Sequence, residues 1–317
     1  MAAARRAVRA PQDAAADVVR PILKWAGGKR QLLPALRPYY PAAFDRYVEP
    51  FLGSGAVFLD CHNRGVLAGR TVSLSDINAD IIGCYRMVRD EVEAVIAGLT
   101  ALENGHRANG SAHFYEVRDQ RFNAIRRDLQ RAASPDLAYT PELAAMLIYL
   151  NRTGYNGLFR LNRRGAFNVP AGRYSAVRIC DAANLRHLSA ALQRPRLTLR
   201  VRSFEDALRD VGRGDFVYLD PPYAPVSRTA HFTSYTAARF GPVEQQLLQQ
   251  LVVELARRGA SVLLSNSVAP DITRLYRDDV QARSAGLRAT EVPARRAINS
   301  RASGRGAVRE YLITNIV

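Results

Sequence analysis

The stretch Phe216–Pro225, FVYLDPPYAP, places a carboxylate, two prolines and an aromatic ring directly after a short apolar run. Asp220 ends that run, so its side chain can face a ligand beyond the strand. Pro221 and Pro222 have no backbone N–H, and they fix the direction of the carbonyls around them. Tyr223 then offers a flat ring for stacking. Together these groups suit a planar heterocycle with an exocyclic amino group.

Two hydrogen-bond acceptors at this turn, the Asp220 carboxylate and the Pro221 carbonyl, can take both N–H bonds of an adenine N6 amine. These bonds polarise the nitrogen, whose lone pair is otherwise delocalised into the ring, so that it can attack a methyl sulfonium in line. No strong base is needed before the attack, because the proton can leave once the nitrogen is cationic. The rate would come from positioning and electrostatics. The alternative interpretation is a turn that only ends a strand.

A second motif, EPFLGSG at residues 49–55, follows a short predicted strand. Gly53 and Gly55 let the backbone turn tightly and approach a ligand, and Asp76 follows about twenty residues later, where a carboxylate can bond ribose hydroxyls. This arrangement predicts a nucleoside cofactor. Phe58 stands where a third glycine would complete the dinucleotide fingerprint, which disfavours NAD. Alone, a Gly-Ser-Gly segment is more often only a turn.

The segment KWAGGK contains both lysines of the chain, Lys24 and Lys29, among 45 basic residues. Because arginine fills every other basic position, a compact ammonium at these two sites indicates a specific need. The segment is not a phosphate loop, since no Ser or Thr follows Lys29 and the earlier glycine is missing. Trp25, the only tryptophan, is either a core ring or a wall beside the cofactor.

The charge balance of the 317 residues indicates a polyanionic partner. The 45 basic and 29 acidic residues give a net charge of +16, which favours nucleic acid, although a GC-biased genome would also raise the arginine count. The cysteines, Cys61, Cys84 and Cys180, have neither metal-ligand nor disulfide spacing, so we expect no metal site and a reducing, cytoplasmic location. No apolar run has the length of a membrane span.

Strand and helix patterns alternate at both ends of the chain, which predicts an α/β fold with parallel strands. We expect strands over residues 46–49, 71–75, 197–201, 215–219 and 261–265, and helices over 56–62, 78–89 and 243–258. Between residues 91 and 196 this alternation stops, and helical patterns over 114–130 and 141–151 precede a Gly- and Arg-rich stretch. We interpret this block as an insertion with a separate task.

Six blocks, in order, resemble the Dam-type DNA adenine methyltransferases, the D12 class or alpha group. They are KWAGGKRQLLP, YVEPFLGSGAVFL, SDINADII, YLNRTGYNGLFRLNRRGAFNVPAGRY, YLDPPYAPVSRTAHFTSY and RRAINSRASGRGAVREYL. The resemblance implies a Rossmann-like S-adenosylmethionine-dependent methyltransferase fold with an inserted, mainly helical target-recognition domain that carries a β-hairpin. We expect a disordered tail over residues 1–19, the catalytic, cofactor-binding domain over 20–90 and 197–317, and the target-recognition domain over 91–196.

The resemblance also implies S-adenosylmethionine as methyl donor and N6 of adenine in double-stranded DNA as acceptor. It assigns the cofactor contacts to Trp25, Lys29, Gly53, Gly55, Asp76 and Asp220. The catalytic set that it implies is Asp220, Pro221, Pro222 and Tyr223. Asp220 would accept a hydrogen bond from the target amine and lie near the donor's amino group as well.

The stretch NRTGYNGLFRLNRRGAFNVPAGRY contains the predicted recognition hairpin, whose arms, residues 158–161 and 166–169, flank a turn over 162–165. Such a ribbon fits the major groove, where arginine can pair with guanine and apolar groups can touch a thymine methyl. By similarity, Arg160 is the main base reader. The other DNA contacts implied by the resemblance are Lys24, Tyr155, Asn156, Leu158, Pro170 and Arg173.

Within this set, Tyr155 resembles the ring that wedges into the base stack, and Asn156 the residue beside the orphaned partner of a flipped adenine. Leu158 and Pro170 are the apolar contacts. The segments YNGLFR, FNVP and GRY match GATC-specific members, so we predict GATC as the target. Phe159 and Ala171 depart from the family pattern inside the ribbon, and Arg163 and Arg164 are expected at phosphates.

Two other functions stay open. An RNA adenine methyltransferase could use the same pocket, but the ribbon disfavours it, because a protein cannot readily read the narrow major groove of duplex RNA. A DNA-binding module without catalysis is disfavoured by the intact DPPY segment. We also expect residues 225–236 to close over cofactor and DNA, the arginines between 295 and 309 to meet phosphates, and the chain to act as a monomer. Restriction partner, repair marking and phage protection are not separated by any residue.

Overall fold

The computed structural model describes residues 18–25, 29–131, 138–174, 177–224, 240–295 and 307–317. In this part of the chain, seven strands form one sheet in the order β3-β2-β1-β4-β5-β7-β6. The strands are β1 (Arg46–Glu49), β2 (Thr71–Asp76), β3 (Leu197–Val201), β4 (Asp215–Leu219), β5 (Ser261–Ser267), β6 (Arg288–Arg295) and β7 (Ala307–Thr314). The five strands predicted from the sequence are confirmed, with β2 and β5 extending one and two residues further.

The first five strands are parallel, and β7 enters antiparallel between β5 and β6. The chain passes outward from β1 to β2 and β3, then returns to β4 on the other side of β1. The carboxyl ends of β1 and β4 therefore lie next to each other at the point where the strand order reverses. Open α/β sheets bind ligands at such a point.

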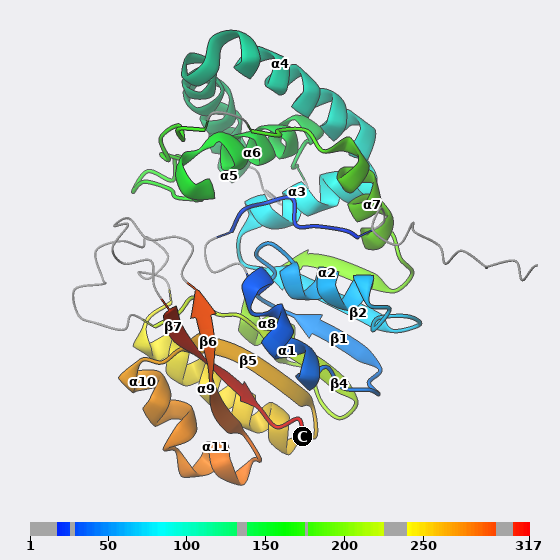
Figure 1. Cartoon of the computed structure of the whole chain (residues 1–317), viewed down its shortest axis with the longest axis vertical. Coiled ribbons are helices and arrows are strands. Elements are labelled where there is room, and N and C mark those ends of the chain that lie inside the picture. The colour runs from blue at the N-terminus through cyan, green and yellow to red at the C-terminus, as the bar shows by residue number, and fades with distance from the viewer. Residues whose placement is uncertain (1–17, 26–28, 132–137, 175–176, 225–239, 296–306) are drawn as a thin grey trace, which may run out of the picture.

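Helices cover both faces of the sheet (Figure 1). The α-helices are α1 (Leu33–Leu36), α2 (Ala56–Asn63), α3 (Ala79–Asp90), α4 (Val92–Glu116), α5 (Asn123–Arg131), α6 (Pro141–Thr153), α7 (Ala182–Leu192), α8 (Phe204–Leu208), α9 (Pro242–Arg257), α10 (Pro270–Ile272) and α11 (Val280–Ser284). Short helical turns of other types are η1 (Lys29–Gln31), η2 (Arg37–Tyr39), η3 (Val117–Phe122), η4 (Tyr155–Gly157) and η6 (Thr273–Arg277).

The central strand β4 is buried along its whole length and supplies both hydrophobic cores. Phe216 and Tyr218 pack into the core that contains residues of α2, α3, α6 and α7. Val217 and Leu219 point to the opposite face and pack with residues of α8 and α9. An apolar run without polar alternation is what a parallel strand covered on both faces requires.

The predicted helix starts follow from local capping chemistry. Asn78 caps α3 by accepting a hydrogen bond from the backbone N–H of Asp80, and Thr140 caps α6 by accepting one from Leu143, with Pro141 at the first helical position. At the start of α9, the Glu244 side chain accepts a hydrogen bond from the Gly241 N–H at 2.7 Å. Each cap satisfies a backbone donor that the helix itself leaves unpaired.

The block between α3 and β3 is mainly helical, as predicted. In Figure 1, α4, α5 and α6 gather beyond one end of the sheet, with α3 between them and the strands. The expected helix over residues 114–130 is present as the end of α4, the π-type turn η3 and α5, whereas the part of α4 from Val92 to His113 that precedes it was not predicted. The expected helix over 141–151 is α6.

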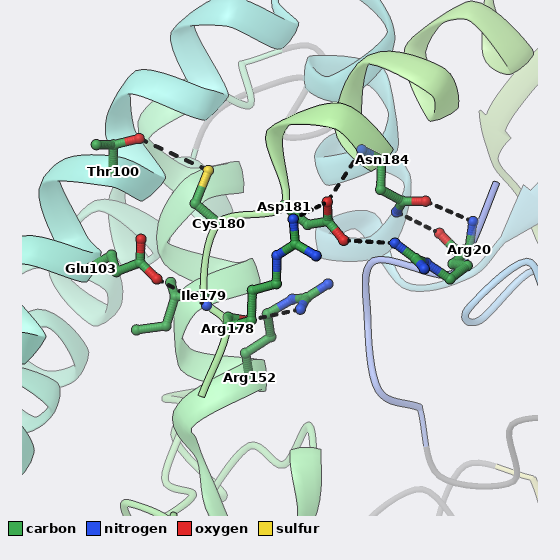
Figure 2. Close-up of polar contacts among 9 residues, drawn as sticks. All are labelled: Arg20, Thr100, Glu103, Arg152, Arg178, Ile179, Cys180, Asp181 and Asn184. Carbon is green, nitrogen blue, oxygen red and sulfur yellow. Dashed lines mark hydrogen bonds and ion pairs between the residues drawn. The ribbon is translucent and has the colours of Figure 1, made fainter. Parts of the chain in front are cut away.

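The segment from residue 18 to residue 25 crosses from the sheet side to this helical block. Val19, expected in a disordered tail, is buried, and its N–H donates to Asn63 at 3.0 Å. Arg20 exchanges two backbone hydrogen bonds with the Asn184 side chain and forms an ion pair of 3.0 Å with Asp181, as Figure 2 shows. These contacts fix the position of this segment against α2 and α7.

Candidate active site and nucleic-acid interface

Three acidic side chains meet at the carboxyl ends of β1, β2 and β4. Glu49 and Asp76 are the last residues of β1 and β2, and Asp220 directly follows β4. Burial raises the pKa of Glu49, and the charges of Asp220 and Asp76 raise it further, which places all three in one region. The structure thus brings together the two motifs that the sequence separates by more than 140 residues.

Asp220 is held by two side chains from other parts of the chain. The Nζ atom of Lys29 lies 2.8 Å from its Oδ1 atom, and the Ser265 hydroxyl donates to the same oxygen at 3.2 Å. Burial raises the pKa of Asp220, and the Lys29 charge opposes that effect. For Lys29, burial acts to lower the pKa, but Asp220 is the first of several groups that raise it overall, so the ammonium stays charged.

The Tyr223 ring lies beside this ion pair. The Lys29 ammonium is 4.4 Å from the ring centroid, and the Tyr223 hydroxyl donates to Oε2 of Glu310 at 2.7 Å. The Gln245 side chain donates to the Pro222 carbonyl at 2.8 Å, which fixes the backbone of the turn. Within the part of the chain that the structure describes, no hydrogen bond to the Pro221 carbonyl is found.

The glycine loop after β1 closes on Trp25. Gly53 has a φ of 49° and Gly55 a φ of 63°, both in the left-handed region that favours glycine. A Cβ atom added at Gly53 would lie 2.9 Å from Cδ1 of Trp25. The ring therefore covers the loop, and it also contacts Phe159 of the predicted ribbon, with ring centroids 5.6 Å apart. Trp25 connects the glycine loop to the recognition segment.

The Asp76 carboxylate faces the same loop. Its Oδ2 atom accepts a hydrogen bond from the Gly53 N–H at 3.0 Å, and its Oδ1 atom accepts one from the Asn78 N–H at 2.9 Å. Burial raises the pKa of Asp76 to about 6, although these backbone donors oppose the shift. Next to it, Ile77 leaves 73% of its surface exposed, an apolar face beside a hydrogen-bonding carboxylate.

The predicted ribbon pairs by isolated bridges. Leu161 pairs with Phe167 and Gly154 with Ala171, and the Asn162 side chain accepts hydrogen bonds from the backbone of the turn that it begins. The Arg160 side chain lies along the opposite arm, where Nε donates to Oδ1 of Asn168 at 2.8 Å. The predicted hairpin pairing is confirmed, without a continuous ladder.

Two anchors hold this ribbon against the helices. The Asn123 side chain exchanges a pair of hydrogen bonds with the Phe167 backbone, at 2.9 and 2.8 Å. Arg126 donates to the Gly165 carbonyl in the turn and forms a buried ion pair with Asp80, at 2.8 Å. Because Asp80 lies in the first turn of α3, the ribbon and the Asp76 loop share one rigid support.

The remaining DNA-contact candidates surround the ribbon. Tyr155 is 42% exposed at the start of η4, and Asn156 has a φ of 53° in the same turn. Lys24 is exposed, and its backbone is held by the Asn151 side chain at 2.7 and 2.8 Å. Leu158 is half-buried, and Pro170 and Arg173 are exposed. All of them lie on the part of the chain where we expect DNA.

A family model for the D12 class N6 adenine-specific DNA methyltransferases matches residues 25–294 of this chain. The chain belongs to this class. Its sheet order, with the antiparallel β7 beside β5, is consistent with the Rossmann-like methyltransferase fold expected from the sequence. Membership gives the general function, which is methylation of adenine N6 in DNA with a methyl donor.

Several relatives match this chain over nearly its whole length. It is 34% identical over 297 residues to the type II methyltransferase M1.LlaDCHI of Lactococcus lactis subsp. cremoris, covering 94% of this chain and 95% of the relative. It is 35% identical over 308 residues to the type II methyltransferase M.MjaIII of Methanocaldococcus jannaschii, covering 94% and 99%. The DNA adenine methylase of Serratia marcescens is 35% identical over 295 residues, covering 92% and 97%.

Several residues of this site were not predicted from the sequence. Glu49 is buried beside Asp220, accepts a hydrogen bond from Tyr47 at 2.8 Å, and has its pKa raised to about 8, chiefly by burial. Its place at the end of a strand was a usable signal. Ser265 could have been suspected because polar residues, Ser265 to Ser267, end an apolar strand. Glu310 lies within the last of the six blocks, but nothing in the sequence pairs it with Tyr223, which is 87 residues away.

The described residues bear on only some of the other predictions. Among the described residues, no cluster of three metal-ligating side chains occurs, and no helix there is long and apolar enough to cross a membrane. The expected closing loop, residues 225–236, and most of the arginine-rich segment lie outside the described residues. Of that segment, Arg309 is described, and it forms an ion pair of 3.2 Å with Glu291.

Proposed function

We propose that this methyltransferase transfers a methyl group from S-adenosylmethionine to N6 of an adenine within GATC in double-stranded DNA, with the target base rotated out of the helix. The observation that carries the proposal is the arrangement around β4. Asp220 supplies a carboxylate, Pro221 a backbone carbonyl and Tyr223 an aromatic ring, and these groups stand together beside the Asp76 loop. This arrangement meets the hydrogen-bonding needs of an adenine amine.

The residues around the glycine loop fit the cofactor. Asp76 can accept hydrogen bonds from ribose hydroxyls, and the exposed Ile77 offers an apolar face to a nucleobase. Gly53 allows close approach, because its lack of a side chain leaves room beside Trp25. When bound, S-adenosylmethionine supplies an electrophilic methyl group on a sulfonium.

The acceptor side of the reaction rests on the DPPY segment. The Asp220 carboxylate and the Pro221 carbonyl each accept one N–H bond of the adenine amine, which orients the nitrogen lone pair for attack. Tyr223 stacks on the base and excludes water from one side. Burial raises the pKa of Asp220, so this carboxylate can also take the proton that the amine releases after methyl transfer.

The DNA side of the proposal rests on the ribbon and its surroundings, within the target-recognition region of residues 91–196. Arg160 is exposed and braced, as a residue reading guanine should be. Tyr155 is an exposed ring next to a strained turn residue, a combination suited to occupying a gap in the base stack. GATC is supported by the match of this segment to GATC-specific members of the family.

The experiment that tests this proposal incubates the protein with labelled S-adenosylmethionine and three substrates: a DNA duplex with one GATC, a DNA duplex with the site scrambled, and an RNA duplex with the corresponding GAUC. Label on the GATC adenine alone supports the whole proposal. Label on another DNA adenine keeps the reaction but discards the target sequence, and preferred label on RNA overturns the substrate. Binding without label would indicate a DNA-binding module.

A matched pair of variants assigns the chemistry to the site. Asp220→Asn keeps the shape of the side chain but removes the charge, so we expect DNA binding to persist while methyl transfer is lost. Asp210→Asn changes an exposed acid just before β4 and should leave transfer unchanged. Equal loss of DNA binding and of transfer in Asp220→Asn would contradict its catalytic role.

A further inference from the structure

The side chain of Glu310 enters the site from the antiparallel strand β7. In the sheet, Glu310 is opposite Ser267 of β5 and Val292 of β6, so its position is fixed by pairs on both sides. From there it accepts the Tyr223 hydroxyl at 2.7 Å. A hydrogen bond of this length to a carboxylate is charge-assisted and among the stronger ones in proteins.

We propose that Glu310 is a positioning residue for methyl transfer, because its hydrogen bond to Tyr223 sets the orientation of the ring on which the target adenine stacks. This inference rests on the function proposed above. It adds a residue from the far end of the chain to a site otherwise built from strand ends. Glu310 acts through Tyr223 and does not itself contact the reacting atoms.

The geometry explains why the ring needs this bond. The Gln245 side chain fixes the Pro222 carbonyl, and the Ser267 hydroxyl fixes the Ala224 carbonyl at 2.7 Å, so the backbone on either side of Tyr223 is held. Neither contact restrains rotation of the side chain itself. The hydroxyl bond to Glu310 supplies that restraint at the outer end of the ring.

A second line of contacts connects the same ring to the catalytic carboxylate. Lys29 lies 4.4 Å from the Tyr223 centroid and 2.8 Å from Asp220. A continuous series of contacts therefore runs from Glu310 through Tyr223 and Lys29 to Asp220. In this series the Lys29 ammonium lies between two carboxylates. The charge of Glu310 also helps to raise the pKa of Lys29, which keeps the ammonium between the two carboxylates protonated. Loss of Glu310 should loosen the ring without removing any group that touches the amine.

The test compares four variants and a control: Glu310→Ala, Glu310→Gln, Tyr223→Phe, the double variant Glu310→Ala with Tyr223→Phe, and Glu291→Gln. Glu291 lies on the neighbouring strand β6 and pairs with Arg309 and Arg277, away from Tyr223. Steady-state kinetics give kcat and KM for a GATC duplex, and a fluorescent 2-aminopurine at the target position reports the stacking of the rotated base. Thermal unfolding checks that each variant is folded.

We expect Glu310→Ala and Tyr223→Phe each to lower kcat by about ten- to a hundredfold, with little change in KM for DNA. The double variant should lose no more than either single one, because both remove the same bond. Glu310→Gln should retain most activity, since its side-chain oxygen can still accept the hydroxyl. The stacking signal of 2-aminopurine should change in Glu310→Ala and Tyr223→Phe, and Glu291→Gln should resemble the wild type.

Independent, multiplying losses in the double variant, or an equal loss in Glu291→Gln, would overturn the inference in favour of a structural role for this part of the sheet. If Glu310→Ala does not fold, the comparison of Glu310→Gln with Tyr223→Phe tests the inference. The kcat of Tyr223→Phe should then lie about ten- to a hundredfold below that of Glu310→Gln. A wild type that methylates no substrate overturns the proposed function and this inference together. A wild type that methylates DNA beside a fully active Glu310→Ala overturns the inference alone.

Discussion

The Nζ atom of Lys29 lies 2.8 Å from Oδ1 of Asp220, and only 5% of the lysine side chain is exposed. A buried charge is stable only with a partner, and removing one member of such a pair leaves the other uncompensated. The charge of Glu310 also acts on this ammonium, and Glu49 lies near Asp220. A compact cation fits among these carboxylates, which gives a physical reason for a lysine in a chain that otherwise uses arginine.

Replacing Lys29 should shift the pH dependence of catalysis. In the wild type, burial raises the pKa of Asp220 and the Lys29 charge opposes the rise. Lys29→Met removes that opposition, so the pKa of Asp220 should increase, and activity that needs the ionised carboxylate should disappear at a higher pH as the solution is acidified. Profiles of kcat/KM against pH measure the shift. Arg30→Met, an exposed neighbour, is the control, and an unmoved acid limb in Lys29→Met would contradict the coupling.

Cofactor affinity should depend on the ionisation of Asp76. Burial raises the pKa of this carboxyl to about 6, and hydroxyl donors of a ribose bind its charged form better. The affinity for S-adenosylmethionine should therefore rise with pH through this pKa and fall as Asp76 becomes protonated. Calorimetric titrations from about pH 5 to about pH 8 measure the effect. Asp76→Asn should bind weakly and lose this dependence, and an identical pH profile in that variant would rule out Asp76 as the titrating group.

The glycine loop offers a matched pair of substitutions. Gly53 and Gly69 both have positive φ, 49° and 70°, but a Cβ at Gly53 would lie 2.9 Å from Trp25 and one at Gly69 would contact nothing within 4 Å. Gly69→Ala should cost about 1 kcal/mol of unfolding free energy from backbone strain alone. Gly53→Ala should cost more and should also weaken cofactor binding. Denaturant unfolding and titration with S-adenosylmethionine measure both; equal behaviour of the two variants would contradict the close packing of Trp25.

The five parallel strands were predictable because each is a short apolar or alternating segment that ends at a turn or a polar residue, whereas β6, β7 and the strand order were not predicted. Helix α4 was harder to predict. Its Gly98 lets α4 approach α6 closely, since a Cβ there would lie 2.9 Å from Cβ of Ala145, and Gly110 has a non-helical conformation inside the helix. Glycines chosen for packing or for a bend weaken the helical pattern in sequence, because intrinsic propensity counts against them.

The same distinction applies to the candidate site, where the local motifs were predictable and the long-range contacts were not. Asp220, Tyr223, Gly53 and Asp76 could be found because each belongs to a local motif with its own chemistry. The Lys29 to Asp220 pair and the Tyr223 to Glu310 bond join residues that are far apart in sequence, and nothing in the local pattern specifies such partners. Phe159, which departs from the family pattern, packs against Trp25, so this departure falls at the contact between the ribbon and the cofactor loop.

Base reading by Arg160 should be separable from phosphate binding by Arg164. The Arg160 guanidinium is braced by Asn168, with Nε at 2.8 Å from its Oδ1 and an Nη atom at 3.2 Å from its backbone carbonyl, whereas Arg164 is exposed in the turn. Arg160→Ala should cost about 1–3 kcal/mol at one base pair and relax discrimination there. Arg164→Ala should weaken binding to all sequences alike and lower the salt dependence by about one ion.

Methylation rates on GATC duplexes, each with one base pair replaced, distinguish the two roles, and binding measured at several salt concentrations gives the ion count. Asn168→Ala adds a further check, because loss of the brace should give a smaller relaxation at the same base pair as Arg160→Ala. If Arg160→Ala instead lowered the rate uniformly on every duplex, Arg160 would have to be reassigned to the phosphate backbone, and the reading of GATC would belong to another part of the ribbon.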